Sequence, residues 1–600
     1  MFLPLFVALA SSQIPLNSSK PPEFLKWAPK PPMGWNSWDC YGTTLTEEQF
    51  KANADYMADK LRPHGWQYAV VDIQWYEPNS KGFDYNPQAT LTMDANGRLL
   101  PAVNKFPSAK GGKGFKALAE YAHKKGLKFG IHLMRGIPRQ AVEKALPILG
   151  TKYNASQIAD KEHICPWNAD MYGVDMSKKG AQEYYDSVFK LIASWGVDFV
   201  KVDDLSRPYM QNIREIDAIR LAIDKTKRPM VLSLSPGETD IDAAMHVTRS
   251  ANMWRISDDF WDSWKALREQ FARLSKWNQH NGPGHYPDAD MLPLGTLANG
   301  TRKTNFTRDE QYTLMSLWAI AKSPLMLGAD MTKMDSFTES LLTNDAVIDL
   351  NQNSVDNHPF YEENGIVAWT ATDPKTKDRY AAVFNGQDPY QFSRGELLFD
   401  GPILDRDTPD HSVNVIANLE GFSSIALVFA DTTDGSSFDH GLWIDPTLEY
   451  ENGTKIHLAN DKWQFASVGY GEASIKSAVN GEAFSVMGKS IPVGIFAHAP
   501  SMLVYEVPSG AYSFSAIAAI NDSGLKGNMG ATMQPLILGF KKGGLQEQKS
   551  MDMAFDLGPA GAMAGSKVTD LWTGQTWTME SSTTHLDIPW HGCKLLKISN

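Results

Sequence analysis

The chain has 600 residues, a formal net charge of −12 and three cysteines. This length is too great for a single hydrophobic core, so we expect several domains. The acidic balance argues against nucleic acid as a partner, because binding phosphates requires clustered Lys and Arg, and so few cysteines exclude a disulfide-rich scaffold.

The chain begins with an apolar segment, Met1–Ala10, followed by Ser-Ser-Gln. This segment is too short to span a bilayer and ends in small residues, so we predict a signal peptide over residues 1–12 and a secreted, extracellular protein. No later apolar run has membrane-spanning length, so we expect no membrane association. Sequons of the form Asn-x-Ser/Thr, which agree with a secreted glycoprotein, occur at Asn17, Asn154, Asn299, Asn305, Asn452 and Asn521.

Strand and helix patterns alternate between residues 26 and 348. The segment 47–61, for example, has a helical stripe of Phe50, Ala54, Met57 and Leu61. Other helices are predicted over 113–125, 180–195, 213–227, 262–277 and 308–322, and buried strands at 33–38, 68–73, 128–133, 199–203, 229–234, 252–256 and 324–330. This alternation predicts an α/β fold, a (β/α)₈ TIM barrel over residues 26–348.

Beyond about residue 350 the pattern changes to short strands separated by turn residues, without segments of helix length. We predict an antiparallel β-sandwich that is split between residues 349–431 and 550–600. Residues 432–549, which begin with a polar stretch and continue with further strands, are expected to form an inserted β-rich module.

Acidic residues follow two of the predicted barrel strands. The run Phe199-Val-Lys-Val-Asp-Asp-Leu205 ends in Asp203 and Asp204, and Trp254-Arg-Ile-Ser-Asp-Asp259 ends in a second pair. Capping of the following helices is the alternative role for Asp203, Asp204, Asp258 and Asp262. Strand ends of a barrel face the active site, and glycoside hydrolysis needs two carboxyl groups on opposite sides of one bond.

Several motifs together resemble glycoside hydrolase family 27, the α-galactosidase or melibiase family. They are Pro32-Met-Gly-Trp-Asn-Ser-Trp38, Lys201-Val-Asp203, Trp254-Arg-x-x-x-Asp259, Gly282-Pro-Gly-x-x-x-Asp-x-Asp-Met-Leu292, Ser323-Pro-Leu-Met-Leu-Gly-Ala-Asp330 and Asp570-Leu-Trp-Thr-Gly574. The block 432–549 resembles a carbohydrate-binding module. The resemblance implies a retaining double displacement in which Asp203 is the nucleophile and Asp259 the acid/base. It also implies substrate contacts from Trp38, Asp72, Lys201, Arg255, Asp290 and Met291.

Three positions depart from the family pattern. Ile73 follows Asp72 where relatives have a second acid that reads galactose hydroxyls, so we expect acceptance of L-arabinopyranose, which lacks the hydroxymethyl group of galactose. His132 stands where the family has an aromatic residue. Ser235 replaces a glutamate that reads the 2-position, as in N-acetylgalactosaminidase relatives, and both residues are expected to contact substrate.

The resemblance implies an exo-acting α-galactosidase, with a β-L-arabinopyranosidase preference as a variant of the same chemistry. We expect it to act on oligosaccharide or polysaccharide side chains that end in galactose or L-arabinopyranose. An α-N-acetylgalactosaminidase and a non-catalytic galactoside-binding protein are the alternatives. We expect no metal or other cofactor, because none of the fourteen histidines forms a His-x-His pair. No pattern predicts an oligomeric state.

Overall fold

The computed structural model describes residues 21–387, 395–432, 438–460, 463–478, 481–526, 530–542 and 550–600. The chain divides into two compact units: unit 1 comprises Met1–Gln387 and Met551–Asn600, and unit 2 comprises Asp388–Ser550. The predicted signal peptide and the sequon at Asn17 lie outside the described residues.

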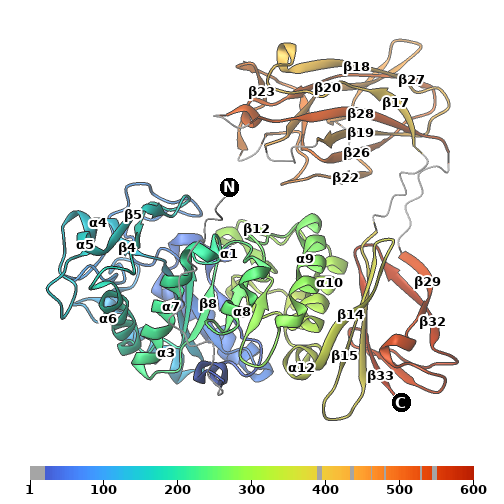
Figure 1. Ribbon diagram of the computed structural model, residues 1–600. Coiled ribbons are helices and arrows are strands. Elements are labelled where there is room, and N and C mark those ends of the chain that lie inside the picture. The colour runs from blue at the N-terminus through green and yellow to red at the C-terminus, as the bar shows by residue number, and fades with distance from the viewer. Residues whose placement is uncertain are drawn as a thin grey trace, which may run out of the picture. The chain divides into compact units, whose positions relative to one another are not determined.

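The first part of unit 1 is the predicted barrel (Figure 1). Its parallel strands lie in the order β10-β9-β8-β7-β3-β2-β1-β13. Their bounds are β1 (Met33–Asn36), β2 (Tyr68–Val71), β3 (Lys128–Met134), β7 (Phe199–Asp203), β8 (Val231–Leu234), β9 (Met253–Arg255), β10 (Tyr286–Asp288) and β13 (Leu325–Leu327). Leu292, just beyond β10, forms a parallel bridge to Leu327. This bridge joins the two ends of the sheet and closes the barrel.

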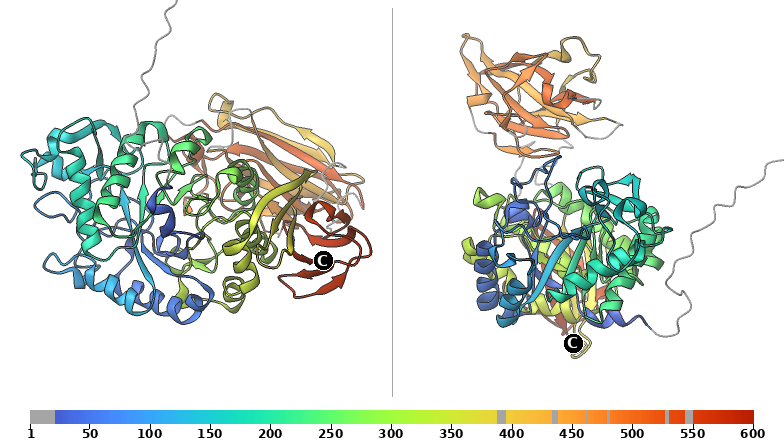
Figure 2. Two further views of the ribbon diagram at one scale, coloured as in Figure 1. Left: turned by 60° about the horizontal axis from the view of Figure 1, so that its bottom comes forward. Right: turned by 90° about the vertical axis from the view of Figure 1, so that its left-hand side faces the viewer.

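Helices surround these strands in both views of Figure 2. The larger ones are α2 (Glu47–Tyr56), α3 (Lys116–Lys124), α6 (Ala181–Ser194), α7 (Tyr209–Thr226), α9 (Trp264–Trp277), α10 (Arg308–Ile320) and α12 (Asp345–Asn353). The predicted stripe from Phe50 to Leu61 is fully buried, and Thr46 and Gln49 form a capping box at the start of α2.

The start of α9 differs from the prediction. Ser263, whose hydroxyl accepts from the Ala266 N–H, caps this helix, so neither Asp258 nor Asp262 does. Asp262 is instead buried and paired with Arg302, and Asp258 is paired with Arg207. Side-chain ion pairs formed across loops determine both roles, and such partners are not visible in the local sequence.

The connection between β3 and α6 is long and carries its own secondary structure. Three strands form a small antiparallel sheet in the order β4 (Ile137–Pro138), β6 (Met171–Val174) and β5 (Ala159–Ile164). Between β4 and β5 the chain forms the short helices α4 (Arg139–Glu143) and α5 (Ala155–Ile158). This excursion leaves the barrel after β3, at the strand end where Asp203 lies on the neighbouring β7.

The C-terminal part of unit 1 is a β-sandwich. One sheet has the antiparallel order β14-β15-β16-β33-β30-β31, and β29 pairs with β32 in a second sheet. The bounds are β14 (Val355–Glu363), β15 (Ile366–Thr372), β16 (Arg379–Asn385), β29 (Ser550–Asp556), β30 (Lys567–Asp570), β31 (Thr576–Thr578), β32 (Thr583–Pro589) and β33 (Cys593–Ser599). The sandwich packs on the barrel through a stacked pair, Trp264 on α9 and His591, whose ring centroids lie 3.8 Å apart.

Unit 2 is a separate sandwich of two five-stranded sheets around a core that includes the stacked pair Phe429 and Trp443. One sheet contains β17 (Glu396–Asp400), β28 (Met533–Phe540), β19 (Ser424–Asp431), β26 (Ser501–Glu506) and β22 (Phe465–Ser467). The other contains β18 (Ser412–Asn418), β27 (Ala511–Ile520), β20 (His440–Tyr450), β21 (Lys455–His457) and β25 (Gly494–His498).

The structure therefore places the start of the inserted unit at residue 388, upstream of the expected boundary at 432. The strands β17 and β19 lie in the range that was predicted to belong to the C-terminal sandwich, but they pair with β28 inside unit 2. Short strands of both sandwiches have the same alternating pattern, so pairing partners and not local sequence decide the boundary.

Candidate active site

A cavity of about 480 Å³ opens at the ends of the barrel strands, and both candidate carboxylates, Asp203 and Asp259, line it. Asp203 is the last residue of β7, and Asp259 follows β9. Other predicted site residues that line the cavity are Trp38, Asp72, Ile73, Lys201, Arg255, Asp290 and Met291. His132 and Ser235 do not belong to its lining and are fully buried.

Two residues, on or next to the neighbouring strands, contact the carboxylate of Asp203. Nε2 of His132, on β3, lies 2.9 Å from Oδ2 of Asp203, and the Ser235 hydroxyl, just after β8, donates to Oδ1. Burial raises the pKa of Asp203, but the charges of Lys201 and His132 and these hydrogen bonds outweigh it and lower the pKa well below its usual range. The carboxylate is therefore ionised, as a nucleophile requires.

Lys201 links two of the acids. Its Nζ donates to Oδ2 of Asp72 at 3.0 Å and lies 3.8 Å from Oδ1 of Asp203. The same Asp72 oxygen accepts from Nδ2 of Asn36 at 2.7 Å, and the Ile73 N–H donates to the other oxygen. Burial lowers the pKa of Lys201, but Asp203 and Asp72 together raise it above its usual value. Lys201 is therefore a fixed positive charge between two carboxylates.

Arg255 links Asp259 and Asp290, as Lys201 links Asp72 and Asp203. Its Nη2 lies 3.1 Å from Oδ1 of Asp259 and 2.8 Å from Oδ2 of Asp290. The two candidate carboxylates differ in burial: the Asp259 side chain is 52% exposed, whereas that of Asp203 is 7% exposed. An exposed carboxyl at the edge of the cavity can still reach a departing oxygen and an incoming water, whereas the buried Asp203 cannot exchange protons freely with solvent.

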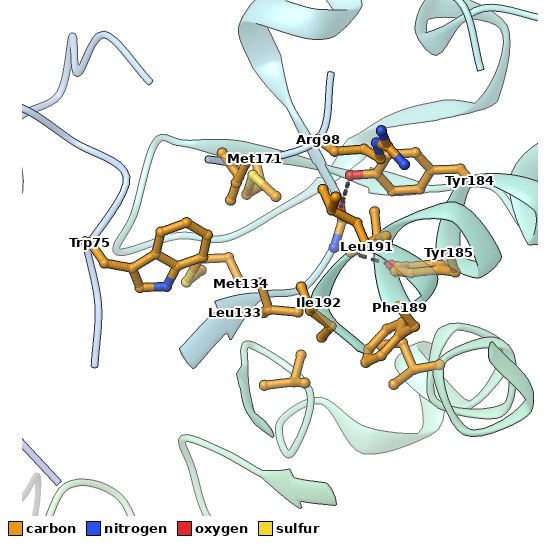
Figure 3. A pocket seen from close by; sticks show the side chains of 15 residues that line it. Trp75, Arg98, Leu133, Met134, Met171, Tyr184, Tyr185, Phe189, Leu191 and Ile192 are labelled. Carbon is orange, nitrogen blue, oxygen red and sulfur yellow. Dashed lines mark hydrogen bonds between the residues drawn. The ribbon is translucent and has the colours of Figure 1, made fainter. Parts of the chain in front are cut away.

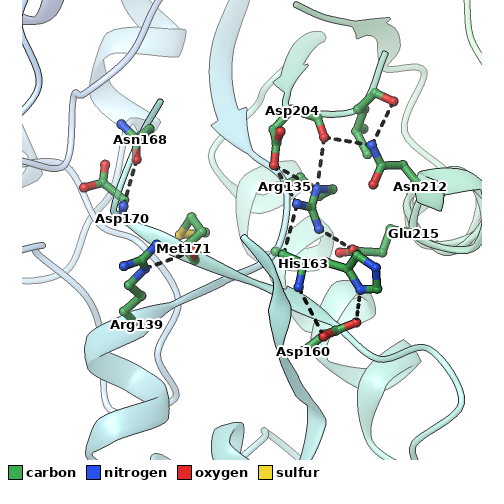
Figure 4. Close-up of polar contacts among 12 residues, drawn as sticks. Arg135, Arg139, Asp160, His163, Asn168, Asp170, Met171, Asp204, Asn212 and Glu215 are labelled. Atoms are coloured by element: carbon green, nitrogen blue, oxygen red, sulfur yellow. Dashed lines mark hydrogen bonds and ion pairs between the residues drawn. The ribbon is translucent and has the colours of Figure 1, made fainter. Parts of the chain in front are cut away.

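Asp204 belongs to a buried network behind the cavity (Figure 4). Its carboxylate accepts from Nε and Nη2 of Arg135 at 3.0 and 2.6 Å, and Nη1 of Arg135 donates to Glu215 on α7 at 2.8 Å. Asn212 donates to the backbone carbonyl of Asp204. Burial raises the pKa values of Asp204 and Glu215, and Arg135 lowers both. The network ties the residue after Asp203 to the β3 excursion and to α7.

Several cavity residues were not predicted. They are half-buried aromatic residues, an exposed ion pair and a buried acid, namely Tyr85, Trp167, Trp261, Arg207 with Asp258, and Asp39. Tyr85 and Trp167 lie in excursions without a periodic pattern, so no sequence signal marks them. Asp39 directly follows one motif and Trp261 lies two residues after another, and this proximity is the signal that could have identified them.

A second cavity lies between β3 and α6 (Figure 3). Apolar side chains such as Trp75, Met134, Phe189 and Ile192 line it, and its volume is about 20 Å³. Such a volume holds little more than one water molecule. This cavity is therefore a packing void and not a second substrate site. Within the described ranges, no group of three or more His, Cys, Asp or Glu side chains is arranged to hold a metal ion, and no helix has the length and apolarity needed to cross a membrane.

Comparisons with known proteins agree with this geometry. Residues 172–353 match the family model described as alpha galactosidase A, and residues 454–538 match the NPCBM/NEW2 domain. The chain is 32% identical over 327 residues to an α-galactosidase of Coffea arabica, an alignment that covers 54% of this chain and 70% of the relative. It is 28% identical over 364 residues to an α-galactosidase of Oryza sativa, covering 60% and 72%.

Among solved structures, a β-L-arabinopyranosidase of family GH27 from Geobacillus stearothermophilus, in complex with arabinose, is similar over nearly its whole length. The identity is 37%, the TM-score is 0.67, and the match covers 96% of this chain and 99% of that one. The similarity therefore includes the barrel, the C-terminal sandwich and the inserted unit.

Proposed function

The chain belongs to glycoside hydrolase family 27 and is a glycosidase, and from this premise we propose that it removes terminal β-L-arabinopyranosyl residues and, more slowly, α-D-galactopyranosyl residues from glycans. The observation that carries the choice of sugar is Ile73, which is 2% exposed and lines the cavity beside Asp72. The arabinose-bound relative, at 37% identity, supports the same choice.

The proposed reaction is a double displacement with retention at the anomeric carbon. An Asp203 oxygen attacks C1 while Asp259 gives its proton to the glycosidic oxygen, so the C1–O bond breaks and a glycosyl ester forms on Asp203. Asp259, now ionised, takes a proton from water, and the resulting oxygen nucleophile displaces Asp203 from C1. The low pKa of Asp203 keeps the carboxylate ionised for the first step and makes it a good leaving group in the second.

The choice of sugar follows from what Ile73 can and cannot bind. L-arabinopyranose has the ring hydroxyls of galactose but a hydrogen where galactose has CH₂OH. An aliphatic side chain beside Asp72 packs against that bare position and offers no acceptor to a 6-hydroxyl. An unpaired hydroxyl in a closed site costs about 1–3 kcal/mol, so galactosides should be slower but still accepted.

The α-N-acetylgalactosaminidase alternative receives less support from this geometry. Ser235 suggested that activity, but its hydroxyl donates to Asp203 and the residue is 1% exposed. Arg255, Pro236 and Gly237 line the cavity and remain as neighbours for a 2-substituent. None of them provides the serine contact on which that alternative rested.

The proposed function is tested by comparing kcat/KM for three p-nitrophenyl glycosides: β-L-arabinopyranoside, α-D-galactopyranoside and α-N-acetylgalactosaminide. We expect the arabinopyranoside to be the best substrate, the galactoside to be slower and the acetylated sugar to be slowest. Asp203→Ala should remove all three activities. A galactoside rate above the arabinopyranoside rate would overturn the proposed preference.

We also propose that the enzyme is secreted and acts on glycan side chains outside the cell. The apolar start of the sequence and its sequons support this proposal. Asn299, Asn305 and Asn452 are exposed, whereas Asn521 is 1% exposed and its amide group is hydrogen-bonded, so the three exposed sites should carry glycan and Asn521 should not. Peptide mass spectrometry of protein secreted from a eukaryotic host checks both statements.

A further inference from the structure

Aromatic rings line part of the cavity, and of these the sugar chemistry described above uses only Trp38, which is expected to contact substrate. Trp38 and Tyr85 stack with an interplanar angle of 10°, and Tyr85 adjoins Trp167 at 5.5 Å between ring centroids. Phe83, which does not itself line the cavity, connects two of these rings: its centroid lies 5.4 Å from that of Trp38 and 6.3 Å from that of Trp261. These five residues, here called the aromatic belt, form a continuous series of rings drawn from the connections that follow β1, β2, β3 and β9, with Trp38 at the start of the short helix α1 (Trp38–Tyr41).

The belt differs from the inner part of the cavity in burial and charge. Asp72, Lys201 and Asp203 are buried or nearly so and carry charge, whereas every ring of the belt is half-buried and presents some of its surface to solvent. The cavity volume of 480 Å³ lies in the range of about 300–1,000 Å³ that accommodates a drug-sized ligand, which is larger than one pyranose. The cavity therefore has room beyond the sugar that is released.

An ion pair provides polar groups in the same outer region. Nη2 of Arg207 lies 2.7 Å from Oδ1 of Asp258, and Nη1 donates to Oδ2 at 2.8 Å. Both residues line the cavity, and their side chains are 58% and 62% exposed. The remaining N–H groups of Arg207 can donate to hydroxyls, and the Asp258 oxygens can accept from them.

We propose that the aromatic belt and the Arg207–Asp258 pair bind the sugar on the leaving side of the scissile bond, a pyranose that is the penultimate unit of a glycan side chain. Pyranose C–H faces pack on aromatic rings, and their hydroxyls need charged or polar partners at the ring edge. A purely aromatic leaving group would use the belt but not the ion pair. The inference rests on the proposed glycosidase reaction and specifies its substrate as a glycan and not an aryl glycoside.

The test compares three substrates that share one L-arabinopyranosyl unit and differ only in the leaving group: fluoride, p-nitrophenol and a second pyranose. Fluoride fills no outer site, so its kcat/KM serves as the denominator. In Trp261→Ala the disaccharide/fluoride ratio should fall about tenfold, a loss of about 1.4 kcal/mol. In Arg207→Ala this ratio should fall while the aryl/fluoride ratio stays as in the wild type.

Two control variants lie outside the cavity. Trp577→Ala removes a half-buried tryptophan of the C-terminal sandwich, and Lys303→Ala breaks an exposed ion pair whose lysine side chain is 58% exposed, as that of Arg207 is. Both should leave the three-substrate ratios unchanged. Circular dichroism of Trp261→Ala checks its folding, and the exposed Arg207→Ala provides a second variant that should not affect folding.

Equal losses for all three substrates in Trp261→Ala, or unchanged ratios in both cavity variants, would overturn the proposed outer site. Wild-type protein that hydrolyses none of the substrates would instead overturn the glycosidase reaction. Binding separates the two failures: the Kd of the disaccharide for Asp203→Ala protein should rise about tenfold when Trp261→Ala is added, whether or not turnover occurs. An unchanged Kd would overturn the site.

Discussion

Nε2 of His132 lies 2.9 Å from Oδ2 of Asp203, so the histidine that was expected to contact substrate instead contacts the candidate nucleophile. The imidazole of His132 contacts one carboxylate oxygen of Asp203, and the hydroxyl of Ser235 donates to the other, so both oxygens are held in place. His132 is therefore a positioning residue, and its effect on the reaction should pass through Asp203.

Loss of the imidazole should slow the chemical step. We expect His132→Ala to lower kcat about 10- to 100-fold with little change in KM, because a group that stabilises the departing carboxylate acts mainly in the transition state. His132→Gln, whose side chain keeps a donor, should recover part of the loss. His123→Ala, at a partly exposed ion pair with Asp198, is the control. A change confined to KM would instead indicate direct substrate binding.

Exchange of Ile73 should change the choice of sugar. We expect Ile73→Asp to raise the galactoside/arabinopyranoside ratio of kcat/KM about tenfold, since a carboxylate can accept from the 6-hydroxyl and no longer packs on a bare ring position. Ile73→Val keeps the apolar surface and should keep the wild-type preference. If the ratio is the same in Ile73→Asp and wild type, Ile73 does not select the sugar.

The acids around Arg255 should make stability depend on pH. Burial raises the pKa of Asp290, Arg255 opposes this, and Asp259 and Asp288 raise it further, to about 7. A carboxyl whose pKa is higher in the folded protein than in the unfolded chain stabilises the fold when it is protonated. This stabilisation is complete below the pKa of the unfolded chain, about 3.9, and is lost as the pH rises through the pKa of the folded protein. Asp203, with a lowered pKa, contributes stability that is fully present above about pH 3.9 and is lost only at lower pH, so it does not affect the comparison between pH 5 and pH 8.

We therefore expect a higher Tm near pH 5 than near pH 8, measured by differential scanning calorimetry. Asp290→Asn should reduce this difference because the amide does not ionise. Asp84→Asn, at an exposed position, should leave the difference intact. A Tm that is independent of pH in the wild type, or a difference that survives Asp290→Asn in full, would contradict the assignment.

Removal of Arg135 should destabilise the barrel. The side chain is 5% exposed and pairs with Asp204 and Glu215, so Arg135→Met leaves two buried carboxyl groups without their cation, at a cost of about 3–5 kcal/mol. Arg273, whose pairs with Glu238 and Glu269 lie at the surface, is the matched control and should cost about 0–1 kcal/mol. Denaturant unfolding followed by tryptophan fluorescence compares the two, and equal losses would contradict this account of the network.

Local sequence was sufficient for the barrel and for the candidate acids Asp203 and Asp259, whereas the other inner-site residues were predicted only through the resemblance to family 27. Short apolar runs and helical stripes mark the strands and helices, and polar residues at or just beyond the end of a parallel strand, such as Asp72, Asp203 and Asp290, lie at the same end of the barrel. The start of the inserted unit was missed because strand pairing, which local sequence does not show, separates the two sandwiches.

Interactions between loops were also beyond the sequence. The contacts of His132 and Ser235 with Asp203 cross from one strand to the next, and only the register of β3, β7 and β8 brings them together. The aromatic belt joins residues from irregular excursions, where no periodicity indicates which side chains meet. The exposure of Asp259 likewise depends on how the loop after β9 is folded.

The most direct test of the proposed reaction is the mass of peptides from protein treated with a 2-fluoro-β-L-arabinopyranosyl fluoride, in which the slow second step lets the glycosyl ester accumulate. We predict one added fluoroarabinosyl group, carried by the peptide that contains Asp203. A label on any other residue, or complete turnover to product of inverted configuration without a labelled peptide, would contradict the assignment of Asp203 as nucleophile.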